Sequence, residues 1–177
     1  MEQVILVNEK DEELGIMEKI VAHEKAILHR AFSIFIFNTK GEMLLQQRAV
    51  KKYHSAGLWT NACCSHPRPG ETTLVAAKRR LKEELGFETE LKEVFDFIYK
   101  TPFDNGLTEH EFDHVFTGVY NHSIHPDEKE VLDYCFKSMD DIDYSLKNHA
   151  HKYTAWFVLA FPRIMQWWQQ QSFYSAD

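Results

Sequence analysis

The sequence predicts an α+β (mixed α/β) domain made of strands, one central helix, further strands and terminal helices. Short β-rich runs lie on both sides of a stretch with helical periodicity, and further helical stretches follow towards the C-terminus. The composition agrees with this class, because 44% hydrophobic and 27% charged residues are typical of a globular chain. With 177 residues to bury one core, we expect a single domain over residues 1–177.

The first part of the chain is predicted to be mainly β. Residues 4–7 should form a short strand, followed by a turn at residues 8–13. Residues 31–37 are a β-rich run, and Asn38-Thr39-Lys40-Gly41 is a turn signal before the next apolar segment, residues 43–47. These two runs therefore predict a hairpin.

The central helix is the clearest single element. Thr72 or Thr73 is a suitable N-cap, the helix should run to about Leu85, and Gly86 lies where a C-cap belongs. An apolar stripe at helical spacing is formed by Leu74, Ala77, Leu81 and Leu85. We expect this stripe to face the core.

The last part of the chain continues the alternation. Residues 95–99 and 112–120 are predicted strands, and residues 140–146 a short helix. A longer helix is expected over residues 156–171, bent or interrupted near Pro162, because proline removes a helical hydrogen bond.

Charge and cysteine usage narrow the classes of function. The net charge of −7 argues against a nucleic-acid-binding domain, which usually needs a net basic face, although a local basic pocket can still bind a small anion. No run reaches the ~18 unbroken apolar residues of a membrane span. Cys63 and Cys64 are adjacent and Cys135 makes the count odd, so we expect free thiols in a reducing cytoplasm. The sequence does not indicate an oligomeric state.

The central helix belongs to a longer pattern that resembles the Nudix signature. That signature runs Gly, five residues, Glu, seven residues, then Arg-Glu-apolar-any-Glu-Glu-any-Gly-apolar. Laid on residues 65–87, it is matched at Glu71, Arg79, Leu81, Glu83, Glu84, Gly86 and Phe87. It is not matched at Ser65, which replaces the first Gly, or at Arg80, which replaces the Glu after Arg79.

Arg80 changes the chemistry expected of this helix. In a Nudix hydrolase the helix gathers carboxylates around Mg²⁺ ions, and a guanidinium in place of one carboxylate favours holding a diphosphate instead. Glu84 lies one turn further on the same side, so the pair suits a diphosphate, with the carboxylate acting through a bridging Mg²⁺. The alternative is an ordinary i,i+4 surface pair worth ~0.3–0.5 kcal/mol.

A second group of residues suggests a metal site. Imidazole and carboxylate groups recur in Ala22-His23, Leu28-His29, Cys64-Ser65-His66-Pro67 and Glu109-His110-Glu111. On a strand, residues two apart point the same way, so Glu109 and Glu111 would share a face, as would Cys64 and His66. Imidazole with carboxylate suits Mn²⁺, Zn²⁺ or Fe²⁺ better than an all-oxygen Mg²⁺ site. The alternative is that each histidine is an ordinary one, since the chain has 10.

Taken in order, these segments are similar to one known family. Trp59-Thr60-Asn61-Ala62-Cys63-Cys64-Ser65-His66-Pro67 and Glu109-His110-Glu111 resemble the two signatures of type 1 isopentenyl diphosphate isomerases, and the similarity runs from Leu14 to about Phe157. The resemblance implies a Nudix-like fold, with mixed β-sheets, a central helix and packed terminal helices. It also implies an isomerase of isoprenoid biosynthesis that interconverts isopentenyl and dimethylallyl diphosphate.

The resemblance further implies a role for each matching position. One divalent ion, Mn²⁺ or Mg²⁺ with Zn²⁺ also open, would be bound by His23, His29, His66, Glu109 and Glu111. Mg²⁺ arriving with the diphosphate would be held by Glu84. The diphosphate itself would be held by Lys19, Arg48, Lys52 and Arg80. The catalytic groups would be Cys64, Glu111, Tyr99 and Trp156.

Two details differ from the family pattern, and a further cysteine lies beside the expected catalytic thiol. Ser65 follows the thiol where many relatives have Gly, and His23 and His29 are one residue closer than in some bacterial relatives. Cys63 also places a second thiol beside Cys64.

The isomerase chemistry explains why such groups are needed. The double bond moves when a proton is added at one carbon and another is removed two carbons away, on opposite faces, through a tertiary carbocation-like state. Cys64 and Glu111 are the expected pair across a dry pocket. Trp156 would stabilise the cation by ~0.5–2 kcal/mol, its alternative role being a core tryptophan.

Two other functions stay open at this point. A Nudix diphosphate hydrolase would need the carboxylate cluster that Arg80 interrupts and would have no use for Cys64. A catalytically silent Nudix-fold binding module would keep its function after loss of the metal and of Cys64.

Overall fold

The computed structural model describes residues 2–52 and 54–171, and within these ranges nine strands form one mixed sheet. The strands are β1 (Gln3–Val7), β2 (Glu13–Glu18), β3 (His29–Phe37), β4 (Met43–Arg48), β5 (Trp59–Thr60), β6 (Cys63–Ser65), β7 (Lys92–Pro102), β8 (Thr108–Val119) and β9 (Val131–Lys137). The helices are α1 (Lys19–Glu24), α2 (Thr73–Leu85), α3 (Met139–His149), the 3-10 helix η1 (Ala150–Lys152) and α4 (Ala155–Gln169). The predicted α+β class is confirmed.

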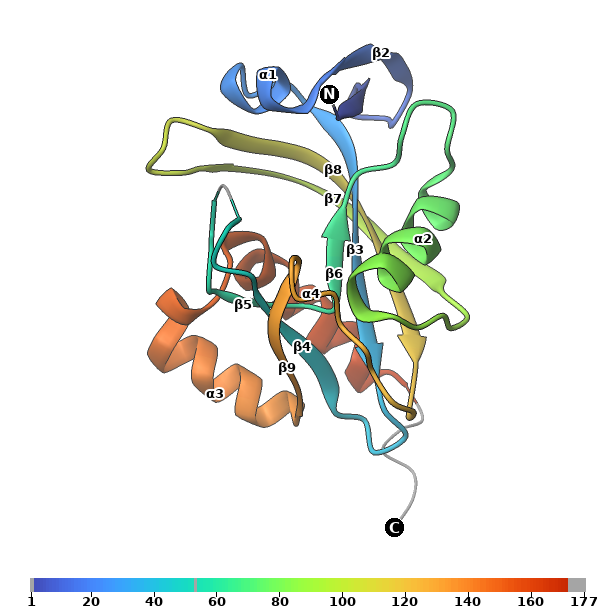
Figure 1. The fold of residues 1–177 in the computed structure, drawn as a ribbon, viewed down its shortest axis with the longest axis vertical. Coiled ribbons are helices and arrows are strands. Elements are labelled where there is room, and N and C mark those ends of the chain that lie inside the picture. The colour runs from blue at the N-terminus through green and yellow to red at the C-terminus, as the bar shows by residue number, and fades with distance from the viewer. Residues whose placement is uncertain (1, 53, 172–177) are drawn as a thin grey trace.

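Strand β3 is the centre of the sheet (Figure 1). It runs parallel to β8, which forms a long antiparallel ribbon with β7. It also pairs with β1 and β6, whereas it meets β4 only at Phe37 and Met43. The predicted hairpin is therefore limited to its turn, because β4 leaves β3 at once and pairs along its length with β9.

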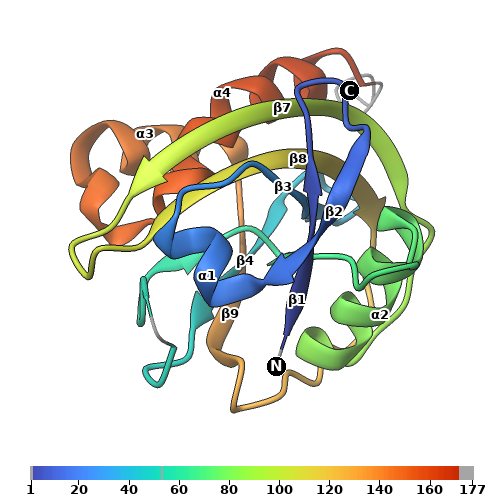
Figure 2. The same ribbon diagram turned by 90° about the horizontal axis from the view of Figure 1, so that it is seen from above.

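Helices cover the sheet on both sides, with α2 on one face and α3 and α4 on the other (Figure 2). The alternation of β3 explains this, because side chains of successive residues point to opposite faces. Ile34 and Ile36 pack in the core beneath α2, while Phe35 and Phe37 pack in the core beneath α4. Both faces of β3 are therefore buried, as its unbroken apolar run requires.

The predicted ends of the central helix are confirmed. The Thr72 side chain accepts a hydrogen bond from the Val75 N–H, and Gly86 ends α2 in a left-handed conformation with φ 74°. A side chain at position 86 would place its Cβ 2.4 Å from the carbonyl oxygen of His125, so glycine is needed there. Leu74 was predicted to face the core with this stripe, and that prediction is wrong. It lies in the first turn of α2, and the residue is 39% exposed.

The C-terminal helix is continuous from Ala155 to Gln169, so of the two predicted effects of Pro162, a bend or an interruption, the interruption is wrong. One missing hydrogen bond does not end a helix whose Phe157, Phe161 and Ile164 are buried against the sheet. No helix among the described residues is long and apolar enough to cross a membrane.

The sequence did not predict β2, α1, β5 or β9. It placed Cys64 and His66 together on a strand, whereas β6 ends at Ser65, one residue before His66. Helix α1 has six residues and no side-chain N-cap, so it carries little local signal. It lies beside β1 and β2 over one end of the sheet (Figures 1 and 2). This end holds the candidate site.

Candidate active site

A cavity of about 400 Å³ opens at the end of the sheet beneath α1. The sequence-predicted site residues that line it are Lys19, Arg48, Lys52, Cys64, His66, Arg80, Glu84, Tyr99, Glu109, Glu111 and Trp156. The two remaining predicted residues, His23 and His29, lie behind this lining, next to His66. The fold thus brings together residues from seven elements: α1, β4, β6, α2, β7, β8 and α4.

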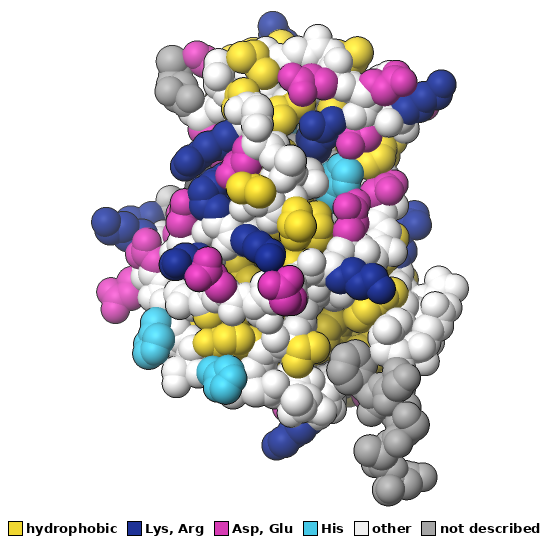
Figure 3. Space-filling view, turned by 90° about the vertical axis from the view of Figure 1, so that its right-hand side faces the viewer, with side chains coloured by type: hydrophobic (Ala, Val, Ile, Leu, Met, Phe, Trp, Pro, Cys, Tyr) yellow, Lys and Arg dark blue, Asp and Glu magenta, His cyan; other side chains and the backbone are white. Residues whose placement is uncertain are grey.

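On the outer face with α2, by contrast, acidic and basic side chains are interspersed (Figure 3).

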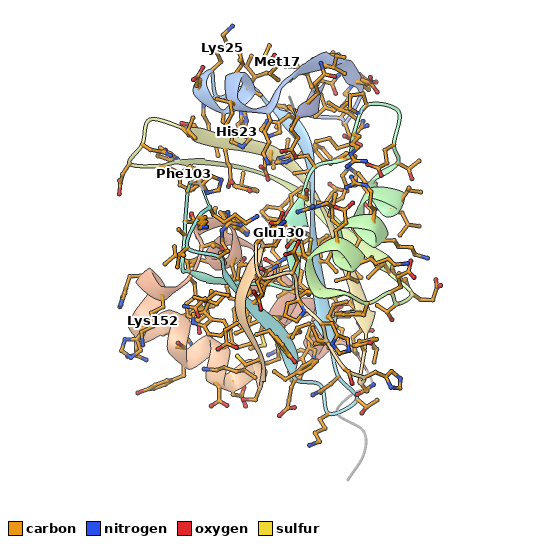
Figure 4. The ribbon with its side chains drawn as sticks, viewed as in Figure 1. Met17, His23, Lys25, Phe103, Glu130 and Lys152 are labelled. Atoms are coloured by element: carbon orange, nitrogen blue, oxygen red, sulfur yellow. The ribbon has the colours of Figure 1, made fainter. Side chains whose placement is uncertain are left out.

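Three histidines and one glutamate form a compact buried cluster. His23 comes from α1, His29 begins β3, His66 follows β6, and Glu111 lies on β8, with His23 pointing from α1 towards the sheet (Figure 4). One ligand atom from each lies within 4.8 Å of all the others. Glu111 Oε1 is 3.0 Å from His66 Nε2 and 3.6 Å from His29 Nε2.

The orientation of the imidazole rings fits a metal ion. His23 Nδ1 is 2.6 Å from the Lys19 carbonyl oxygen, and His29 Nδ1 is 2.8 Å from that of Ile27. With Nδ1–H donating to a carbonyl, each Nε2 presents its lone pair to the cluster. Both Nε2 atoms are buried and have no hydrogen-bond partner among the described residues. A divalent ion would satisfy these buried atoms and offset the charge of Glu111.

Glu109 lies beside this cluster and is not one of its members. The Tyr99 hydroxyl is 2.6 Å from Glu111 Oε2 and 3.0 Å from Glu109 Oε2, so it connects the two carboxyl groups. Glu109 Oε1 is also 3.5 Å from His54 Nε2. The two glutamates share a face of β8, as the spacing predicted, and both are buried.

The two carboxyl groups differ in charge because their neighbours differ. Burial, together with the negative charge of Glu111, raises the pKa of Glu109 well above its usual range. Burial would also raise the pKa of Glu111, but the adjacent His66 and His29 outweigh it and hold that pKa well below its usual range. Glu111 is therefore the ionised member of the pair.

The Cys64 thiol is enclosed by oxygen atoms that accept hydrogen bonds. Its Sγ donates to Asn61 Oδ1 at 3.1 Å and lies 3.3 Å from Ser33 Oγ. The Ser33 hydroxyl donates to Asp113 Oδ2 at 2.7 Å, and Asn61 Nδ2 donates to the carbonyl oxygens of Ile34 and Cys63 at 3.0 Å. The Ser33 hydroxyl hydrogen and the Asn61 amide hydrogens are thus donated elsewhere. Asn61 Oδ1 and Ser33 Oγ are therefore left as acceptors facing the thiol.

These surroundings stabilise the neutral thiol. Burial, and then the charge of Asp113, raise the pKa of Cys64 well above its usual range. Cys63 is fully buried in the core beneath α2, on the opposite face of the strand. The two adjacent thiols are therefore in different environments, and all three cysteines are free, as predicted.

The cations and Glu84 form a connected network at the α2 side of the cavity. Arg80 Nη2 donates to Glu84 Oε1 at 2.6 Å and lies 3.4 Å from Glu130 Oε1, while Lys52 also contacts Glu130. Glu84 Oε2 accepts from Gln46 Nε2 at 2.9 Å. The Glu84 side chain is 6% exposed, so its bond with Arg80 is not the surface pair that the sequence left as an alternative.

Comparison with known proteins identifies the family. The NUDIX domain family matches residues 27–157. The chain is 50% identical over 169 residues to the isopentenyl-diphosphate Delta-isomerase of Pectobacterium atrosepticum, covering 94% of this chain and 93% of that one. It is 45% identical over 168 residues to isopentenyl-diphosphate Delta-isomerase 2 of Aromatoleum aromaticum, covering 93% and 87%. The chain belongs to the isopentenyl-diphosphate Delta-isomerase family. The family resemblance seen in the sequence is confirmed.

Solved structures agree on the fold of this family member. DR0079 from Deinococcus radiodurans superposes with a TM-score of 0.76 at 18% identity, covering 92% of this chain and 98% of that one. The MutT protein from Methanosarcina mazei gives a TM-score of 0.66 at 20% identity, covering 81% and 96%. The isomerase family member therefore has the Nudix fold that the signature predicted.

Sequence reasoning missed several residues of this site. Ser33, Asn61 and Asp113 surround the thiol, Glu130 joins two cations, and His54 lines the cavity beside Trp156. Asn61 lies within the motif that carried the resemblance, so a signal for it existed. The others come from different strands and loops, and no local pattern connects them with Cys64 or Arg80.

Proposed function

We propose that this chain is an isopentenyl-diphosphate Delta-isomerase that acts as one Nudix-like domain over residues 1–177 and interconverts isopentenyl and dimethylallyl diphosphate. The observation that carries the proposal is that a partly buried thiol, Cys64, and a buried carboxylate, Glu111, line one cavity together with Lys and Arg side chains. The cavity thus combines two proton-handling groups with cations for a diphosphate. Family membership supports the same substrate.

The diphosphate is held by the cationic side of the cavity. Lys19, Arg48, Lys52 and Arg80 neutralise it, and Glu84 would hold a Mg²⁺ ion arriving with it. Glu130, which contacts both Lys52 and Arg80 in the free protein, keeps the two cations close together until the substrate replaces it. This side of the cavity binds and orients the substrate, so that its alkene reaches the catalytic groups.

The alkene lies between the thiol and the Glu111 carboxylate. In the forward direction the neutral Cys64 S–H delivers a proton to the terminal carbon, and Glu111 removes one from the carbon two positions away. Tyr99 donates to Glu111 and so fixes the direction in which that carboxylate points. A divalent ion such as Mn²⁺, Mg²⁺ or Zn²⁺ would be held by the clustered His23, His29, His66 and Glu111, and by the adjacent Glu109. It would supply a positive charge that stabilises the ionised carboxylate.

Trp156 forms an apolar wall of the cavity. In the free protein Arg48 Cζ lies 5.0 Å from the centre of its ring, so the indole face already holds a cation. When Arg48 turns to the diphosphate, the same face becomes available to the carbocation-like state. The indole stabilises positive charge there without offering a nucleophile that would trap it.

A cytoplasmic location completes the proposal and is supported by the free thiols, which a reducing compartment preserves. Fractionating cells that express the tagged chain would test it, and recovery mainly with membranes would contradict it.

Proton NMR in D₂O tests the reaction itself. Purified protein with isopentenyl diphosphate and Mg²⁺ is expected to yield dimethylallyl diphosphate carrying deuterium, and EDTA is expected to stop it. Release of inorganic phosphate without isomerisation would instead establish a diphosphate hydrolase. Binding without turnover by folded protein would establish a binding module.

Variants of the two proton-handling groups test the assignment of roles. Cys64→Ala and Glu111→Gln are each expected to abolish deuterium incorporation while leaving the circular dichroism spectrum unchanged. Cys63→Ala is the matched control, because that thiol faces the core beneath α2. Full activity in either catalytic variant would overturn the mechanism.

A further inference from the structure

A second hollow lies next to the catalytic cavity. It is an open groove of about 690 Å³ between the β7–β8 turn and the start of α4. Its apolar walls include Leu58, Phe103, Tyr153, Val158 and Leu159. Among the described residues, His54 is the one that lines both the groove and the catalytic cavity.

His54 lies at the end of the cavity that receives the hydrocarbon part of the substrate. Its Nε2 is 3.5 Å from Glu109, which shares the Tyr99 hydroxyl with Glu111. Its ring meets the Trp156 ring edge-on at 5.8 Å. The imidazole therefore contacts the indole wall directly and is connected to the Glu111 carboxylate through Glu109 and Tyr99.

The imidazole is held firmly in this position. It stacks on Phe103 with ring centroids 4.6 Å apart and an angle of 17° between the planes. Phe103 lies at the turn of the β7–β8 ribbon, where Figure 4 labels it next to the loop that follows β4. Packed between Phe103 and Trp156, His54 is only 9% exposed. The stacked pair forms a partition with the catalytic cavity on one side and the groove on the other.

We propose that His54 is a specificity-determining residue that ends the hydrocarbon pocket and restricts it to five-carbon diphosphates. The inference rests on the proposed function, since it assumes that the alkene lies against Trp156. Without the imidazole, the catalytic cavity would continue into an apolar groove. The ligand class that fits the joined space is a prenyl diphosphate with a longer hydrocarbon tail, because each added carbon would be buried against apolar side chains.

The test compares the binding of a five-carbon and a ten-carbon saturated alkyl diphosphate to the purified protein by calorimetry, with Mg²⁺ present. These ligands have no double bond, so the enzyme cannot isomerise them. In the wild type the ten-carbon ligand is expected to bind at least tenfold more weakly than the five-carbon ligand. In His54→Ala that ratio is expected to fall at least tenfold, mainly through tighter binding of the long ligand. His151→Ala is the matched control, because His151 lines the groove but not the catalytic cavity, and the wild-type ratio should persist.

An unchanged ratio in folded His54→Ala would overturn the proposal. If alanine prevents folding, His54→Asn removes most of the ring and is measured in the same way. If neither variant folds, the comparison is made with the wild type alone. Equal affinity for the two ligands would overturn the proposal that His54 ends the pocket, and a tenfold preference for the short ligand would support it. Because binding is measured without turnover, failure of the partition is distinguishable from failure of the isomerase, which would appear as no deuterium incorporation by the wild type.

Discussion

Replacing Asn61 by alanine tests how the Cys64 thiol, the proposed proton donor, is positioned. Asn61 is fully buried, and its side chain makes hydrogen bonds to Cys64 Sγ, Thr60 Oγ1 and two backbone carbonyls. The two bonds to carbonyl groups fix the amide so that Oδ1 faces the thiol. In Asn61→Ala the S–H group keeps only the Ser33 hydroxyl as an acceptor, at 3.3 Å. We expect the thiol to adopt more than one orientation.

The size of the effect follows from the hydrogen bonds that the substitution removes. Three buried hydrogen bonds and one partly buried one, at about 1 kcal/mol each, predict a fall in the free energy of unfolding of about 3–5 kcal/mol. We expect kcat to fall about 10- to 100-fold, because a small displacement of a reacting group lowers the rate by this order. KM should stay the same, since the cations that bind the diphosphate are untouched.

The matched control is Thr60→Val. It removes the hydroxyl that donates to Asn61 Oδ1 and accepts from Thr154, but leaves the bond between Asn61 and Cys64. Urea denaturation should show a smaller loss, about 1–3 kcal/mol for two hydrogen bonds, with kcat near that of the wild type. In Asn61→Ala the infrared S–H stretching band, assigned by its absence in Cys64→Ala, should move to higher wavenumber. If the two variants have the same kcat and the band does not move, Asn61 acts on stability alone.

Three further predictions concern the metal, the diphosphate and the core. Adding Mn²⁺ at 100 times its Kd should stabilise the protein by about 2.7 kcal/mol and raise Tm by about 5–10 °C. EDTA should reverse this shift. An equal rise in the Tm of His29→Gln at the same Mn²⁺ concentration would contradict the ligand set. Arg80→Glu should raise KM at least tenfold and impair substrate binding more than folding. An unchanged KM would show that Arg80 does not bind the diphosphate. Leu81→Ala, at a fully buried position on α2, should lower the free energy of unfolding by about 2–5 kcal/mol in urea and leave the KM of the folded enzyme unchanged.

The predictable parts of the fold are those that local chemistry determines. The capping hydroxyl of Thr72 and the left-handed position of Gly86 both lie within a few residues of the helix that they end, so the sequence locates α2 almost to the residue. The β-rich run before Asn38 is located for the same reason. By contrast, β3 and β4 separate directly after their turn, because the partners β8 and β9 come from distant parts of the chain.

The thiol environment shows why part of the site was not predictable. Ser33 faces Cys64 through the register of β3 with β6, and Asp113 reaches Ser33 because β3 also pairs in parallel with β8. Both interactions join segments far apart in sequence, so neither residue has a local signal. Family resemblance supplied Cys64 and Glu111 but not the groups around them. His54 lies in a loop without periodicity, and only its packing against Phe103 and Trp156 reveals it.

Arg80 shows how one departure from a signature changes the chemistry of the fold. Its guanidinium donates at 2.6 Å to both Glu83 and Glu84 and lies 3.4 Å from Glu130, so one cation contacts three carboxylates. Burial would lower the pKa of Arg80, but the charge of Glu84 outweighs it and raises that pKa above its usual range, so the cation is permanent. A glutamate at this position would add a fourth carboxylate and demand metal ions in place of the guanidinium. With the arginine present, we expect α2 to keep Glu84 for one Mg²⁺ and to offer a cation to the diphosphate, which would favour holding the substrate over activating water against it.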